Sequence, residues 1–186
     1  MITIIQKGDK ILRAISENVE PREISSPKIQ KIIQNLQQAL EENIDGLAIA
    51  CPQIGVSLRI FVISKRIFFL DDYGNPFPQS IQNTKKIYED LIFINPQIIN
   101  QSKKTQILLE GCLSIRGLYG DVKRSEKTTV KAYNKEGFIF TRGVSKIMAQ
   151  IFQHEIDHLN GILFCDKAEN LQELAIAPRA RKNRAL

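Results

Sequence analysis

The chain has 186 residues, of which 43% are hydrophobic and 25% charged, and its formal net charge is +6. This is the composition of an ordinary globular domain with a core large enough to need no disulfide bonds, so we predict a single domain over residues 1–186. Three widely spaced cysteines argue against a secreted disulfide framework, and the modest positive charge does not require nucleic acid, so we expect no specific DNA binding.

The N-terminal segment lacks the basic start, apolar run and cleavage site of a signal peptide. No apolar stretch approaches the roughly 18 residues that a membrane helix needs. We therefore expect a soluble, intracellular protein that is located in the cytoplasm and has no membrane attachment.

The first predicted helix begins at Ser26 and Pro27, which are favoured at the N-cap and at the first helical position. Apolar residues then recur at helical spacing, which predicts one buried face through about residue 43. These residues are Ile29, Ile32, Ile33, Leu36 and Leu40.

The middle of the chain contains β-branched and aromatic runs that predict strands. The first strand covers 56–64, and the second covers 91–99, where Pro96 indicates an edge strand or a bulge. Residues 73–76 have the composition of a turn. Further strands are predicted at 105–109, 127–133 and 138–142, the last two as a hairpin.

A second helix is predicted from near Val144 to Asn160–Gly161, a typical C-terminal signal. Strands clustered between helices predict an α+β fold. The last nine residues carry four basic side chains and no acid, which predicts a solvated, mobile tail from about residue 178. A binding arm is the alternative interpretation of Arg179, Arg181, Lys182 and Arg184.

The two histidines, His154 and His158, are four residues apart in the second predicted helix, so their imidazoles share one face and can bind one cation. Ile147 and Ile151 lie on the same stripe, which points the imidazoles into the protein. Glu155 follows the first histidine and can accept a proton from a metal-bound water without being a ligand. The pattern therefore predicts a catalytic metal site.

A site of this kind needs a third protein ligand and an open position. No third histidine exists, which leaves a carboxylate, with Glu169 or Glu173 as candidates, or a thiolate. Cys51 and Cys165 lie in apolar stretches typical of a core. Cys112 lies at the end of a predicted strand and can reach a cleft, although a lone cysteine is more often simply buried.

Three segments, in order, resemble the peptide deformylase family: Gly46 to Gly55, Glu110 to Ser114, and Gln153 to His158. Residues 8–13 are also similar to the start of that family, so the resemblance spans about residues 2–170. It implies an α+β fold with an antiparallel sheet core around a central helix that carries HExxH. The implied activity is hydrolytic removal of the N-formyl group from the N-terminal methionine of new polypeptides, with release of formate.

The resemblance also implies the site. Cys112, His154 and His158 would bind one divalent metal, commonly ferrous iron, with zinc or nickel as alternatives. Glu155 would transfer the proton, while the Gln53 side chain and the Leu113 backbone N–H would stabilise the oxyanion. The peptide would bind as an added strand along Gly46, Leu47, Ala48 and Ile49.

The roles of two acids near the metal motifs stay open. Glu110 either orients the site or pairs with an arginine. Asp157 either supports a ligand or faces solvent.

Three positions depart from the family pattern: Ala48 replaces a glycine, Cys51 an alanine and Arg116 a proline. We therefore expect activity with an altered peptide preference. Two alternatives remain at this point. One is a zincin-type peptidase with Glu169 or Glu173 as a ligand, and the other is a weakly active binding module. The basic tail is a candidate ribosome contact in either case.

Overall fold

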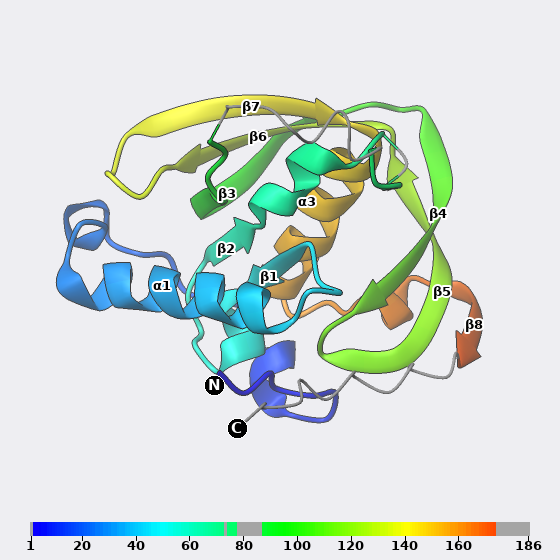
Figure 1. The fold of residues 1–186 in the computed structure, drawn as a ribbon, viewed down its shortest axis with the longest axis horizontal. Helices are drawn as coiled ribbons and strands as arrows, with labels where there is room; N and C mark the ends of the chain where they lie inside the picture. Colours follow the sequence, from blue (N-terminus) through cyan, green and yellow to red (C-terminus); the bar gives the residue numbers. More distant parts are fainter. Residues whose placement is uncertain (1, 73, 78–86, 174–186) are drawn as a thin grey trace, which may run out of the picture.

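The computed structural model describes residues 2–72, 74–77 and 87–173, and Figure 1 shows their arrangement. Two antiparallel sheets contain the described strands. One sheet has the order β1-β2-β3-β6-β7 and comprises Ala48–Ala50, Ile60–Ile63, Leu91–Gln101, Lys127–Tyr133 and Ile139–Ser145. The other has the order β4-β5-β8 and comprises Thr105–Cys112, Ile115–Ser125 and Glu169–Glu173.

The described helices are α1 (Pro27–Glu42) and α3 (Lys146–Leu159), with short 3-10 turns at Lys10–Arg13, Pro21–Glu23, Cys51–Ile54, Lys65–Phe69 and Phe164–Asp166. Helix α3 lies in the centre of the molecule and contacts β1, β6 and β7 of the first sheet and β5 of the second (Figure 1). This arrangement confirms the predicted α+β fold with a central helix.

Helix α1 forms as its sequence predicts. The Ser26 hydroxyl accepts a hydrogen bond from the Ile29 backbone N–H at 3.4 Å, which caps the first turn. The predicted apolar face is buried against β1 and β2, with Ile32 only partly covered. Its fully buried members are Ile29, Ile33, Leu36 and Leu40.

Three buried aromatic rings fix the rotation of α3. Phe152 packs against Phe93 of β3 and Phe61 of β2, with ring centroids 4.8 and 6.0 Å away. Residues two apart on a helix differ by about 200° in direction, so His154 must face away from these rings. Packing of α3 against the first sheet therefore points the His154 side chain toward the second sheet.

The second predicted strand is β3, which lies between β2 and β6, so the edge position proposed for Pro96 is wrong and the bulge is confirmed. The register shifts between Ile94 and Gln97, and Asn95 has a φ of 50°. The bulge accommodates a residue that cannot donate to the ladder.

Strand boundaries differ elsewhere from the predicted ones. β2 is shorter than the predicted strand at 56–64, and β4 continues from Thr105 through Cys112. β1, β5 and β8 had no counterpart among the predicted strands. The hairpin is confirmed as β6 and β7, with Tyr133 opposite Ile139.

Two predictions fall partly or wholly outside the described residues. The first is the turn at residues 73–76, of which Tyr73 lies outside. Gly74 of this turn has a positive φ of 86°, which a turn often requires. The basic tail at 178–186 is the other. The single domain over residues 1–186 stays a prediction. Among the described residues, no helix is both long and apolar enough to cross a membrane.

Candidate metal centre

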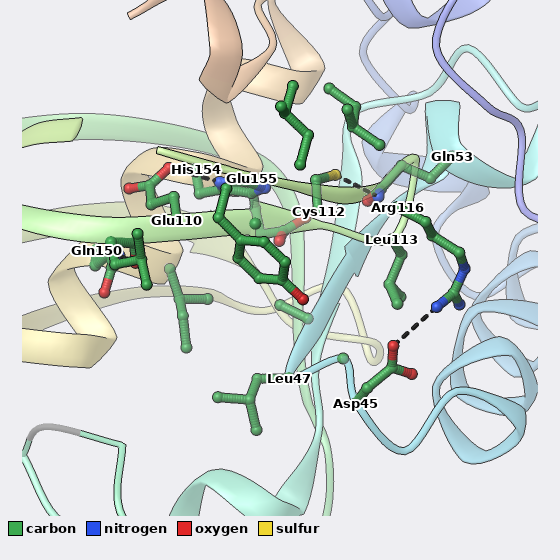
Figure 2. Close-up of a pocket in the computed structure, with 18 of the residues that line it drawn as sticks. Asp45, Leu47, Gln53, Glu110, Cys112, Leu113, Arg116, Gln150, His154 and Glu155 are labelled. Atoms are coloured by element: carbon green, nitrogen blue, oxygen red, sulfur yellow. Dashed lines mark hydrogen bonds and ion pairs between the residues drawn. The ribbon is translucent and has the colours of Figure 1, made fainter. Parts of the chain in front are cut away.

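A pocket of about 290 Å³ opens between the two sheets. β1 contributes Ala48 to one wall, the end of β4 and the start of β5 form the other, and α3 presents His154 and Glu155 (Figure 2). Because β1 and β4 are edge strands of their sheets, each has one side without a strand partner in the part of the chain that the structure describes. The pocket is therefore bounded by backbone that is suited to pair with an extended peptide.

Cys112, His154 and His158 converge beside this pocket. One potential ligand atom of each lies within 4.8 Å of the other two. The Cys112 Sγ is 3.2 Å from the His158 Nε2, and the two imidazole centroids are 5.0 Å apart. The His158 Nδ1 is buried without a hydrogen-bond partner among the described residues. A thiolate and two imidazoles are a donor set that fits a divalent transition metal.

The Cys112 thiol is favoured in its ligating form. Burial alone would raise the pKa of this thiol, but the neighbouring His158 and His154 imidazoles outweigh it and lower the pKa to about 5. Since the thiolate is the form that binds a metal, the surroundings prepare Cys112 for coordination.

Glu110 holds His154 from the side opposite the cluster. Its Oε2 is 2.9 Å from the His154 Nδ1, while both of its oxygens accept hydrogen bonds from Arg124 at 2.7 and 2.8 Å. Burial would raise the pKa of Glu110, yet the Arg124 and His154 contacts lower it to about 2. Glu110 thus both orients a histidine and pairs with an arginine, and the His154 Nε2 is left for a metal.

Asp157, whose environment the sequence left open, is buried. Its Oδ2 accepts a hydrogen bond from Arg124 at 2.6 Å, and Lys167 donates to both of its oxygens at 2.7 and 2.8 Å. Arg124 therefore joins an acid of β4 to an acid of α3. The network fixes the helix that carries the histidines against the strand that ends at Cys112.

Glu155 lines the pocket and is almost completely buried. Its Oε2 has no hydrogen-bond partner among the described residues. Burial raises the pKa of Glu155 to about 7. A carboxyl with this pKa and a free oxygen can both accept and return a proton near neutral pH.

Gln53 and Leu113 lie on the other side of Cys112. The Gln53 Oε1 accepts from the Ala50 backbone N–H at 2.8 Å, which turns its Nε2 toward Ser114 Oγ at 3.2 Å and Cys112 Sγ at 3.4 Å. The Leu113 backbone N–H has no acceptor among the described residues. Two donors are therefore placed close to the cluster.

The four predicted substrate-binding residues do not all reach the pocket. Gly46, Leu47 and Ala48 line it, whereas the side chain of Ile49 is fully buried in the core under α1. Gly46 lies so close to Leu113 that an added Cβ would be 2.6 Å from its Cδ1. A larger residue at position 46 would therefore require the Leu113 side chain to move.

Several pocket residues were not predicted. Ile151, Gln150 and Ile147 lie three, four and seven positions before His154, on the same side of the helix. The two isoleucines were placed on this stripe by the sequence but not assigned to a pocket, and the same helical spacing could have found Gln150. Tyr119 lies on β5, against Gly111, and nothing in the local sequence indicated it. Glu169 and Glu173, the ligands of the peptidase alternative, are exposed on β8 and do not line the pocket.

A thiol and two imidazoles beside a buried carboxyl are the arrangement expected of a metal-dependent hydrolase. Over residues 1–174 the chain matches the family described as polypeptide deformylase. It is 38% identical to a peptide deformylase of Carboxydothermus hydrogenoformans, over 90% of this chain and 93% of that one. It is 34% identical to peptide deformylase 1A, chloroplastic/mitochondrial, of Arabidopsis thaliana, over 88% of this chain, but spans only 60% of that relative's length.

The fold is also similar to that of solved structures. A class I type b peptide deformylase from Acinetobacter baumannii, solved with Met-Ala-Ser bound, superposes with a TM-score of 0.75. The two sequences are 28% identical, and the match covers 89% of this chain and 97% of the other. The chain belongs to the polypeptide deformylase family, whose enzymes remove the N-formyl group from nascent polypeptides with a metal. The predictions of family, fold and activity are confirmed.

Proposed function

We propose that this chain removes the N-formyl group from the N-terminal methionine of new polypeptides, with its metal held by Cys112, His154 and His158. The convergence of these three side chains beside a buried glutamate is the observation that carries the proposal. We propose ferrous iron as the native ion, with zinc or nickel able to replace it, because thiolate and imidazole suit all three. When bound, the ion supplies Lewis acidity that activates water and polarises the formyl carbonyl.

Glu155 performs the proton transfers in this proposal. It removes a proton from the attacking water and delivers it to the departing amine as the C–N bond breaks. Its burial supports both steps, because a pKa of about 7 lets the side chain change protonation state at neutral pH. The formyl group leaves as formate.

Gln53 and Leu113 stabilise the negative charge that develops on the formyl oxygen. The Gln53 amide is held in place by its hydrogen bond from Ala50, so little reorganisation is needed when the charge forms. The Leu113 N–H supplies the second donor from the turn between β4 and β5.

The peptide binds along the free edge of β1, at Gly46, Leu47 and Ala48. The methyl group of Ala48 and the guanidinium of Arg116 are departures from the family pattern that line this groove. They support the proposed change in peptide preference. The cytoplasmic location stays a prediction.

Ribosome contact through the basic tail at 178–186 also stays a prediction. Cosedimentation with ribosomes should fall when the tail is deleted and when salt is raised. Unchanged sedimentation of the truncated chain would remove the idea.

The activity is tested by formate release from a formyl-Met-Ala-Ser peptide, using protein prepared without oxygen and matched for metal content. Glu155→Gln should lower kcat by about 100- to 10,000-fold, because the proton acceptor is lost at nearly constant shape. Glu126→Gln, on the surface beside Lys104, is the matched control and should leave kcat unchanged. Equal turnover by wild type and Glu155→Gln would contradict the proposal.

A further inference from the structure

An ion pair lies across one end of the pocket. The Arg116 Nη1, from the start of β5, donates to the Asp45 Oδ2 at 2.8 Å, and both residues line the pocket (Figure 2). Asp45 belongs to the loop between α1 and β1, so the pair links the two walls. The Arg116 side chain is 24% exposed and that of Asp45 is 58% exposed, which leaves both charges within reach of a molecule in the pocket.

The loop that carries Asp45 is held from two sides. Arg116 also donates through Nη2 to the Asn43 Oδ1 at 2.6 Å. Beneath the loop, the Arg66 Nη2 donates to the backbone carbonyls of Leu40, at 3.2 Å, and Gly46. The loop that carries Asp45 is therefore held in place beside the pocket.

If the peptide binds as the proposed function requires, one of its side chains lies near the ion pair of Arg116 and Asp45. A peptide with its formyl end at Gln53 and Cys112 that follows the free edge of β1 passes Ala48, then Gly46, then Asp45. An extended chain advances about 3.3 Å per residue, so three residues of β1 and its preceding loop correspond to about 10 Å. The second or third residue of the substrate therefore comes beside the ion pair.

We propose that Arg116 and Asp45 determine the charge preference of the enzyme at the second or third substrate residue. While paired, they present a wall without net charge, which accepts acidic and basic side chains alike. Loss of Arg116 leaves an uncompensated carboxylate that favours lysine. Loss of Asp45 leaves an uncompensated guanidinium that favours glutamate. Because the enzyme acts on many different polypeptides, a wall without net charge lets it accept both acidic and basic substrate residues.

The test measures kcat/KM for C-terminally amidated formyl-Met peptides that carry Lys or Glu at the second or the third position. Amidation removes the terminal carboxylate, which would otherwise add a negative charge to every peptide. The proteins are wild type, Arg116→Gln, Asp45→Asn and the exchanged pair Arg116→Asp with Asp45→Arg. Arg13→Gln is the control, because the Arg13–Asp166 ion pair is also on the surface but does not line the pocket.

At one of the two positions, the Lys:Glu ratio of kcat/KM should be near one for wild type and for Arg13→Gln. It should rise by about three- to tenfold in Arg116→Gln and fall by a similar factor in Asp45→Asn, with smaller shifts at high salt. The exchanged pair should return the ratio toward one.

A ratio that stays constant in both single variants would overturn the inference, even if every rate fell together, because a purely structural tie would slow all peptides equally. That result is distinct from failure of the proposed function, in which wild type releases no formate from any of the peptides.

Discussion

Two arginines of the same strand, β5, form ion pairs with opposite surroundings. Arg124 and its partner Glu110 have side chains that are 3% and 2% exposed, and the pair supports a predicted metal ligand. Arg116 and Asp45 are 24% and 58% exposed and line the pocket where we propose that the peptide binds. The same residue type therefore serves the chemistry where it is buried and substrate choice where solvent reaches it.

The difference follows from solvation. A buried charge that loses its partner cannot be rescued by water, so removal of one member is costly. An exposed charge is rehydrated at once, and its pair contributes little to stability. We expect the buried network to decide whether the protein folds and holds metal, and the exposed pair to decide which peptide it prefers.

The largest effect should come from the same substitution made at the two arginines. Arg124→Met leaves Glu110 and Asp157 in the interior with fewer partners and should lower the free energy of unfolding by about 3–5 kcal/mol. Arg116→Met should lower it by no more than about 1 kcal/mol. Urea denaturation of both variants measures this, and equal losses would break the comparison.

The substitution Glu110→Gln tests the effect of this residue on metal affinity separately from its effect on the stability of the fold. The amide can still accept from Arg124 but orients His154 less firmly, so the affinity for the metal should fall by about 10- to 100-fold. Competition with a chelator measures the affinity, with Glu126→Gln as the surface control. Unchanged affinity would show that Glu110 has no part in holding His154 for the metal.

The smallest effect is expected at the exposed pair of Arg13 and Asp166. The Arg13 hydrogen bond holds the pKa of Asp166 below its usual value. The pair therefore stabilises the fold above the unfolded pKa of about 3.9, and this contribution is lost as the pH falls through the lower folded value. Asp166→Asn should cost about 0.2–1 kcal/mol at pH 7 and nothing in strong acid, as measured by thermal unfolding across pH. A cost that does not change with pH would contradict this.

The features that the sequence predicted are those encoded locally. Helix α1 has its cap and apolar period within one segment, and the spacing of His154 and His158 requires only a helix. Proline at position 96 could not distinguish an edge from a bulge, because that depends on which strands lie on either side.

Other features depend on partners far away in the chain. β5 is defined by its pairing with β4 and β8, and its glycines interrupt any alternation that could have revealed it. Asp157 is buried only because Arg124 and Lys167 reach it from other elements. Cys112 alone gave no reason to prefer a ligand over a core residue, and it was the surrounding motif that singled it out.

The central claim is that Cys112 completes a three-residue metal site with His154 and His158. The most direct measurement is the metal content of the protein, purified without oxygen, for wild type, Cys112→Ser and Cys165→Ser. Cys165 lies outside the cluster, so its variant is a matched control for the loss of one thiol. We predict one ion per chain in wild type and in Cys165→Ser, with most of it lost or exchanged in Cys112→Ser. A Cys112→Ser protein that keeps its full complement of the same metal would contradict the claim.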